Sequence, residues 1–173
     1  MQWTIDLAHS QIQFSVKHMG ISTVRGTFGQ FAGTIDEDNG NVKQLTVDID
    51  VASLNTGNGQ RDGHLKSADF FDVENHPSAK FVLTNFSRSG DDITATGDLT
   101  IRGVTKSVTL KGDVAGPAKD PWGNDKVSAT LETKINRKDW GLTWNVALEA
   151  GGVLVSEDVK LHIDVQAQPA AAA

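Results

Sequence analysis

The chain has 173 residues but no cysteine and no tyrosine, and it has only four prolines beside 17 glycines. The lack of cysteine excludes disulfide bonds and thiolate chemistry. Lysine and arginine form no run, and the formal net charge is −6, which argues against a binder of phosphate backbones and against docking on anionic lipid. No apolar run approaches the roughly 20 residues that a membrane-spanning helix needs. We therefore expect neither a nucleic-acid partner nor a transmembrane segment.

The two ends of the chain carry little information of their own. Met1 to Ile5 run directly into a strand pattern, without the basic start and apolar core of a secretory signal. This favours a cytoplasmic location, or a periplasmic one if a signal peptide has been removed. Length and a hydrophobic content of 38% predict a single domain over residues 1–167. Residues 168–173 have no periodicity and are predicted to form a flexible tail.

Apolar and polar residues alternate along most of the chain, which is typical of strands with one buried and one wet face. Turn sequences such as Asp38-Asn39-Gly40 separate these runs and predict sequential hairpins. The fold class is therefore all-β, and about eight such strands predict an elongated, antiparallel, up-and-down β-barrel with short helical insertions. The clearest alternating runs are 45–51, 93–101, 104–114, 127–135 and 159–165.

The interior of a barrel of this size holds either packed side chains or one ligand. Phe28 and Phe31 are three residues apart, so a β-bulge near Gly29 would be needed to turn both rings inward. Helical or coiled insertions are expected around Arg61 and at 137–140, and they add three large aromatic residues to the predicted lining. The candidate apolar lining is Phe14, Phe28, Phe31, Leu45, Ile49, Phe70, Phe71, Leu99, Leu131, Ile135 and Trp140.

The histidines sort by strand phase. His9 and His18 share the phase of the neighbouring apolar residues, so both should point inward or cap the barrel mouth, whereas His162 should face water. The plain interpretation of the two inward histidines is that they are neutral core residues with satisfied hydrogen bonds. A metal triad of His9, His18 and His64 is an alternative, although no cysteine and no histidine pair on one helical turn supports it. We expect no metal.

Residues 61–71 break the alternation with charged and aromatic side chains. One interpretation is an ion-paired loop that plugs one end of the barrel. The other is a polar collar at a cavity mouth, where Arg61 offers a planar fork to an anionic or carbonyl head group and His64 offers a donor. Asp62 and Asp69 would then orient these two cations.

Signatures of catalysis are weak. The sequence has no Gly-x-Ser-x-Gly elbow, no His-Glu-x-x-His pair, no phosphate loop and no cysteine nucleophile. A protein without enzymatic activity is predicted. An enzyme that uses a His–Asp pair on a lipid head group and a ligand-free scaffold barrel remain as alternatives.

Several motifs together resemble the YceI-like family of polyisoprenoid-binding proteins. The resemblance runs from about Trp3 to Val165, nearly the whole chain, and its combination of motifs is too specific to arise by chance. The motifs are Asp6 with His9-Ser10, Lys17-His18-Met19, Ser53 to Gly57, Arg61-Asp62 with His64-Leu65-Lys66, Asp69-Phe70-Phe71, Gly97 to Ile101, and Asn136 to Leu142.

The resemblance implies a lipocalin-like barrel whose apolar tunnel binds, sequesters or transports a long-chain isoprenoid such as an isoprenoid quinone or its precursor. In some relatives the ligand is a fatty acid or fatty amide, many relatives are exported, and many form homodimers. It implies no cofactor other than the bound lipid. Trp140 stands where the family usually has phenylalanine, which would shorten the tunnel. The family's polar positions correspond to His9, His18, Arg61, Asp62, His64, Arg137 and Asp139.

Overall fold

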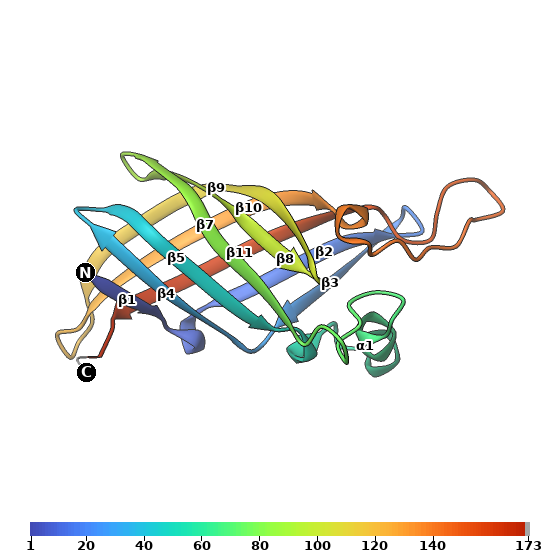
Figure 1. Ribbon diagram of the computed structural model, residues 1–173, viewed down its shortest axis with the longest axis horizontal. Helices are drawn as coiled ribbons and strands as arrows, with labels where there is room; N and C mark the ends of the chain where they lie inside the picture. The colour runs from blue at the N-terminus through green and yellow to red at the C-terminus, as the bar shows by residue number, and fades with distance from the viewer. Residues whose placement is uncertain (172–173) are drawn as a thin grey trace.

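The structure is a computed structural model that describes residues 1–171, and its strands form one antiparallel sheet that closes into an elongated barrel (Figure 1). Among these residues, no helix is long and apolar enough to cross a membrane. The strands are β1 (Gln2–Ile5), β2 (Gln11–His18), β3 (Ser22–Phe28), β4 (Phe31–Asp38), β5 (Asn41–Asp50), β6 (Leu54–Asn55), β7 (Ser78–Ser89), β8 (Asp92–Ile101), β9 (Val104–Lys119), β10 (Asp125–Asn136) and β11 (Asp158–Pro169).

The eleven strands occupy eight strand positions, because three positions are each shared by two strands. β5 pairs with β4 and β6 pairs with β3, so β5 and β6 share one of these positions. β11 pairs with β2 over its first half and with β1 near its end, so β1 and β2 follow one another along the same neighbour. β3 pairs with β2 and β4 pairs with β1, so these two strands share the next position in the same way. The pairing of β1 with β11 closes the ring. The predicted closed antiparallel β-barrel is confirmed.

The break between β3 and β4 differs from the prediction. Instead of a bulge near Gly29, β3 ends at Phe28 and β4 begins at Phe31, and the two strands have different partners. The short β6 pairs with the end of β3, where Phe28 lies opposite Leu54. Because β3 ends and β4 begins here, the inward–outward alternation of side chains restarts at Phe31. The rings of Phe28 and Phe31 therefore both line the interior. The bulge was wrong, although the inward direction of the two rings was right.

The C-terminal boundary also lies later than predicted. β11 continues to Pro169, which pairs with Trp3, and the Ala170 amide donates to the Gln2 carbonyl. The strand therefore extends two residues past the boundary at residue 167, because β1 offers it a partner. Residues 172 and 173 of the predicted tail lie outside the described residues.

The two predicted insertions are present, as α1 (Gly59–Lys66) and the 3-10 turn η3 (Arg137–Trp140). Asn58 caps α1 by accepting a hydrogen bond from the Arg61 amide, as asparagine commonly does at a helix start. Both insertions lie at one end of the barrel, opposite the chain termini, together with the long connection 141–157 (Figure 1). We call this the α1 end. Two further 3-10 turns were not predicted, η1 (Leu7–His9) and η2 (Val51–Ser53).

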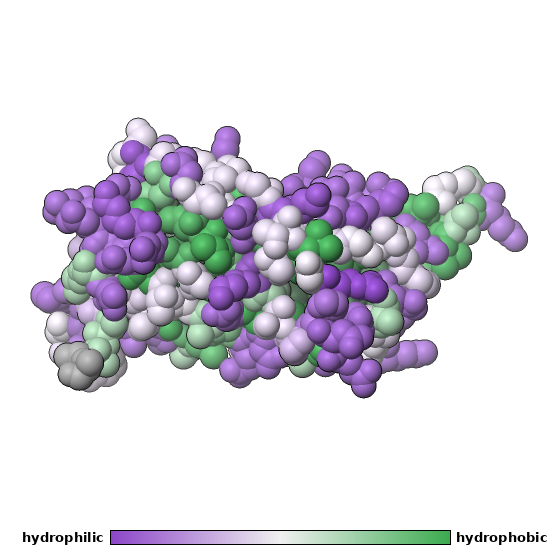
Figure 2. All heavy atoms as spheres, viewed as in Figure 1, coloured by the Kyte–Doolittle hydropathy of each residue, from purple (hydrophilic) through white to green (hydrophobic). Residues whose placement is uncertain are grey.

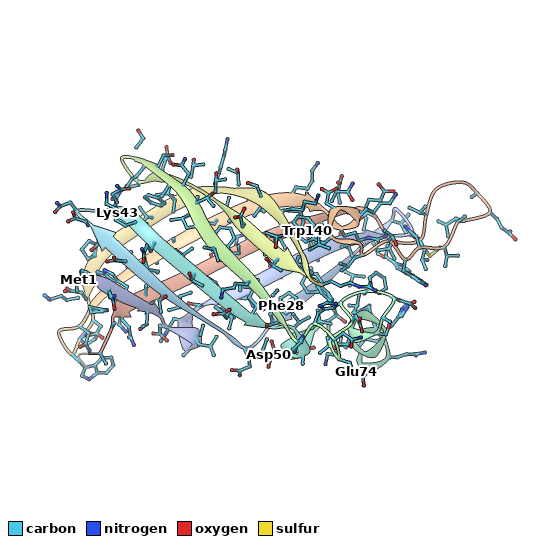
Figure 3. All side chains as sticks on the ribbon, viewed as in Figure 1. Met1, Phe28, Lys43, Asp50, Glu74 and Trp140 are labelled. Atoms are coloured by element: carbon cyan, nitrogen blue, oxygen red, sulfur yellow. The ribbon has the colours of Figure 1, made fainter. Side chains whose placement is uncertain are left out.

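Glycines let large rings lie flat against the inside of the barrel wall. Gly26 on β3 faces the ring of Phe14, and Gly97 on β8 faces the ring of Phe81, so closely that an added Cβ would overlap either ring. These two positions therefore need glycine for space and not for backbone freedom. The face shown in Figure 2 carries many polar residues around a patch of hydrophobic ones, and Figure 3 shows Phe28 and Trp140 toward the α1 end, far from Met1 and Lys43.

Candidate functional site: an internal apolar cavity

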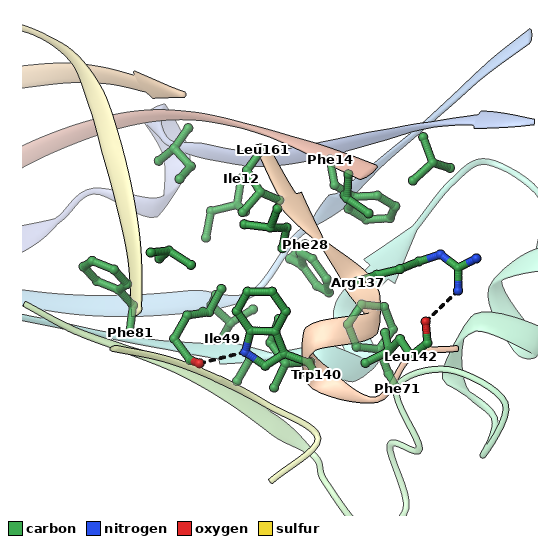
Figure 4. A pocket seen from close by; sticks show the side chains of 18 of the residues that line it. Ile12, Phe14, Phe28, Ile49, Phe71, Phe81, Arg137, Trp140, Leu142 and Leu161 are labelled. Carbon is green, nitrogen blue, oxygen red and sulfur yellow. Dashed lines mark hydrogen bonds between the residues drawn. The ribbon is translucent and has the colours of Figure 1, made fainter. Parts of the chain in front are cut away.

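The barrel encloses an apolar cavity of about 350 Å³ that is lined from all eight strand positions (Figure 4). The lining follows from the pleat, because every second residue of a strand points to the same face. All eleven predicted apolar residues line this cavity; whether they contact a ligand stays a prediction. They are Phe14, Phe28, Phe31, Leu45, Ile49, Phe70, Phe71, Leu99, Leu131, Ile135 and Trp140.

Part of the lining was not predicted. Phe81 and Leu161 lie in strand phase with predicted neighbours, so the same alternation would have found them. Trp144, Leu154 and Val155 come from the connection 141–157, which has no strand periodicity. No sequence signal marks these three as cavity residues.

Trp140 occupies a central place in this cavity. Its side chain is 2% exposed, and its indole Nε1 donates a hydrogen bond of 2.9 Å to the carbonyl of Leu99 (Figure 4). That bond satisfies the polar edge of the ring while the rest of the indole stays in apolar surroundings. The ring is thus held in one orientation in the cavity lining.

Arg61 is held at the α1 end by a single neighbouring residue. Its Nε donates to the hydroxyl of Thr56 over 2.7 Å, and its Nη2 donates to the Thr56 carbonyl over 2.9 Å. Asp62 accepts a hydrogen bond of 3.0 Å from the Thr56 amide and a second hydrogen bond from the Thr56 hydroxyl. Asp62 therefore orients Arg61 through Thr56 rather than by direct contact.

His64 is positioned by one carboxylate and two rings. Its Nε2 lies 2.9 Å from Oδ2 of Asp69, one of the two aspartates that we expected to orient the cations. The imidazole meets Phe70 and Trp144 edge-on, with ring centroids 5.1 and 4.6 Å apart. His18, at the end of β2, is half-buried and lines the cavity beside Val155.

Arg137 is buried, with 5% of its surface exposed, and its guanidinium donates hydrogen bonds to backbone carbonyls. Nη1 donates to the carbonyls of Leu142 (2.6 Å, Figure 4) and Trp144 (3.0 Å). Nε donates to Ser156 over 2.9 Å, and Nη2 donates to Val155 over 3.3 Å. Burial lowers the pKa of this guanidinium from its ordinary value, against a smaller opposing effect of nearby Glu157. Arg137 therefore joins the two limbs of the connection 141–157.

The sequence matches the family described as YceI-like domain over residues 3–167. The chain belongs to the YceI-like family. A YceI protein of Escherichia coli is 39% identical over 160 residues, which are 91% of this chain and 81% of that protein. A crystallised YceI protein of Campylobacter jejuni is 34% identical, with a TM-score of 0.77 over 90% of each chain.

More distant solved structures share the fold. BcnA of Burkholderia cenocepacia has a TM-score of 0.79 at 23% identity, covering 94% of this chain and 98% of BcnA. A polyisoprenoid-binding domain from Saccharophagus degradans has a TM-score of 0.75 at 15% identity, covering 97% of this chain and 98% of that domain. The YceI-like barrel thus persists at identities where most side chains have changed.

Of the seven polar residues that correspond to the family's positions, four line the cavity: His18, Arg61, His64 and Arg137. His9 does not, because η1 interrupts the strand and ends its phase. The His9 ring is 65% exposed, and its Nδ1 lies 2.9 Å from Oδ2 of Asp6. The prediction that His9 points inward was wrong.

The remaining polar positions lie outside the cavity lining. Asp62 acts on Thr56, and Asp139 is exposed on η3. His9, His18 and His64 do not form the alternative metal triad: among residues 1–171, no group of three or more His, Cys, Asp or Glu could hold a metal ion. His162 faces outward on this YceI-like barrel, as predicted, between Glu132 and Asp164.

Proposed function

We propose that this YceI-like protein binds one long-chain isoprenoid lipid in its barrel and sequesters or transports it, with an isoprenoid quinone or its precursor as the ligand. The observation that carries the proposal is an enclosed apolar cavity whose polar lining groups all lie at the α1 end. A molecule with one polar head and one long hydrocarbon chain matches this distribution.

Apolar burial provides enough free energy for such binding without many polar contacts. Each buried methylene contributes about 0.8 kcal/mol, although ordering a flexible chain takes back a large share. The cavity of about 350 Å³ is near the lower limit of the range typical of ligand pockets, about 300–1,000 Å³. It therefore suits one chain rather than several.

The polar groups of the lining favour a head group that accepts hydrogen bonds. Arg61 and His64 each keep one nitrogen, Nη1 and Nδ1, that has no hydrogen-bond partner among residues 1–171. No aspartate or glutamate within that part of the chain lines the cavity. A quinone carbonyl can accept from Arg61, and a phenolic hydroxyl can also donate to Nδ1 of His64, whose Nε2 faces the Asp69 carboxylate, whereas a cationic head would meet two guanidinium groups.

The relatives support a binding role rather than catalysis. The Saccharophagus degradans domain is named as polyisoprenoid-binding, and it shares the barrel fold. The curated relatives are named only as YceI or UPF0312 proteins, and no name among these relatives states an enzymatic activity.

A fatty acid or its amide is the second candidate ligand. A carboxylate head would satisfy the free edge of the Arg61 guanidinium with charge-assisted hydrogen bonds. The acid-free, cationic end of the lining favours an anionic head as much as a neutral acceptor. The hydrocarbon part distinguishes the two candidates, because an isoprenoid chain is branched and unsaturated.

Native mass spectrometry of the purified protein, followed by solvent extraction and mass analysis, tests the proposal. A discrete isoprenoid adduct is expected, and it should be lost in Phe14→Gln, which puts an amide into the apolar lining. Val82→Gln is the matched control, because Val82 is 39% exposed on the outer wall. An apo mass that persists after incubation with isoprenoid quinones and fatty acids would contradict lipid binding, and an acyl adduct would establish the second candidate.

A further inference from the structure

Exposed apolar side chains gather at the α1 end, on two segments that project from the barrel. Among residues 1–171, seven large hydrophobic residues are exposed, and four of these form what we call the apolar tip. The turn between β2 and β3 supplies Met19 (47% exposed) and Ile21 (82%). The connection 141–157 supplies Val146 (46%) and Val153 (42%). Figure 2 shows hydrophobic atoms on this projecting part, which Figure 1 shows as the longest excursion from the barrel.

The two segments of the apolar tip are joined to each other by backbone contacts. The Met19 amide donates to the Leu154 carbonyl over 2.7 Å, and His18 forms an isolated β-bridge with Val155. The Arg137 guanidinium donates hydrogen bonds to both limbs of the connection, at Leu142 and at Ser156. The tip is thus a built structure, not two independent loops.

The apolar tip is continuous with the cavity. Val153 is exposed, whereas Leu154 and Val155, the next residues along the chain, line the cavity. Trp144 lines it two residues before the exposed Val146. Apolar surface therefore extends from the interior of the barrel to its outer end along one short stretch of chain.

Unpaired cations flank the tip on the barrel wall, although the chain as a whole carries −6. Lys17, Arg25 and Lys160 have no carboxylate within salt-bridge distance among the described residues. Ser15 pairs with Lys160 on one side and with Arg25 on the other, so the two cations lie on the same outer face. Glu149 is the sole carboxylate in residues 17–22 and 143–156. Glu157 and Asp158, which follow this segment, pair with Lys138 and Lys134, so the cations without a carboxylate partner are those on the wall beside the tip.

The shape of the tip favours a fluid partner. A stable protein–protein interface needs roughly 800 Å² of complementary surface on each side, and such surfaces are broad. The tip consists instead of two turns that contain Gly20, Gly151 and Gly152 at positive φ. A lipid bilayer conforms to a narrow convex surface, takes up apolar side chains at the acyl boundary, and attracts lysine and arginine through anionic head groups.

We propose that the apolar tip inserts into the surface of an anionic lipid bilayer, with Lys17, Arg25 and Lys160 against the head groups. This step rests on the proposed lipid carriage for its purpose, which is exchange of the ligand between bilayer and cavity. The docking itself depends on the tip and its flanking cations, and it can be measured without any ligand in the barrel.

Flotation with phosphatidylcholine–phosphatidylglycerol vesicles tests this inference. The wild-type protein should float, and the double variant Ile21→Ser/Val153→Ser should bind at least about tenfold more weakly, because two apolar side chains no longer enter the interface. Lys17→Gln/Lys160→Gln should weaken binding to these vesicles but not to pure phosphatidylcholine, and high salt should act like this variant. The control is Trp122→Ser, an 83% exposed aromatic in the β9–β10 turn near the chain termini, which should float as the wild type does.

Three outcomes would overturn the inference: no flotation of the wild type, an equal loss in Trp122→Ser, or a wild-type dimer in sedimentation that Ile21→Ser/Val153→Ser converts to monomer. The last would assign the tip to a second copy of the chain. Protein that carries an isoprenoid adduct but does not float would contradict docking alone. Protein that floats but retains no lipid would instead contradict the proposed carriage.

Discussion

Replacing Trp140 with phenylalanine should reduce stability by about 2–4 kcal/mol. The indole Nε1 donates to the Leu99 carbonyl over 2.9 Å at a site that is 2% exposed. Phenylalanine leaves this carbonyl without its partner, which costs about 1–3 kcal/mol. The smaller ring adds a loss of packing of about 1 kcal/mol, since it enlarges a cavity that already exists. For a chain of 173 residues the sum corresponds to a fall of roughly 5–15 °C in Tm.

The same change should lengthen the chain that the cavity accepts, because the phenyl ring is smaller than the indole that lines the cavity. Urea unfolding gives the free energy, and native mass spectrometry with a series of isoprenoids of increasing length gives the preference. Trp122→Phe is the matched control; its side chain is 83% exposed, so it should stay within about 0.5 kcal/mol of the wild type. An unchanged unfolding free energy would refute the hydrogen-bond argument, and an unchanged length preference would refute the role of Trp140 in limiting the cavity.

Two further predictions concern charged groups. Arg137→Lys keeps the charge but loses the planar guanidinium that donates to both limbs of 141–157, so the free energy of unfolding should fall by about 2–5 kcal/mol. Amides at 142–156 should then exchange faster in hydrogen-exchange mass spectrometry. Unchanged exchange there would contradict the role of Arg137 in joining the two limbs. The hydrogen bond to Glu132 raises the pKa of His162; burial opposes this rise, and Asp164 adds to it. The stabilisation by His162 should thus be complete below about pH 6 and disappear as pH rises through the raised pKa, so the Tm difference from His162→Gln should shrink toward pH 9; a constant difference would exclude it.

Strand alternation predicted the cavity lining well because the pleat alone decides which side chains point inward. Phe14, Leu45 and Leu131 lie on uninterrupted strands, and their inward phase needs no knowledge of tertiary contacts. The same rule failed at His9, because η1 inserts a 3-10 turn after β1 and breaks the phase. It also misplaced a bulge between Phe28 and Phe31, where the chain in fact exchanges one pair of neighbouring strands for another.

The hydrogen bonds by which Arg137 joins the two limbs of 141–157 could not be predicted from periodicity. Its partners are backbone carbonyls 5 to 19 residues away in a connection without alternation. Every residue has a carbonyl, so nothing in the sequence indicates which ones a buried guanidinium will meet. His64 and Asp69 could be assigned to one polar cluster, because they are five residues apart in the sequence and carry complementary groups, but the sequence did not decide which aspartate meets which cation.

The direction of the ligand follows from where the polar lining groups lie. His18, Arg61, His64 and Arg137 are all at the α1 end, while the lining toward the chain termini is hydrocarbon. A lipid carried as we propose therefore points its chain toward the termini and keeps its head group beside α1. The apolar tip is at that same end, so a protein docked through the tip presents the head group of its ligand to the bilayer interface. Entry at this end then requires the chain to thread inward first, past the residues of α1 and η3 that line the cavity.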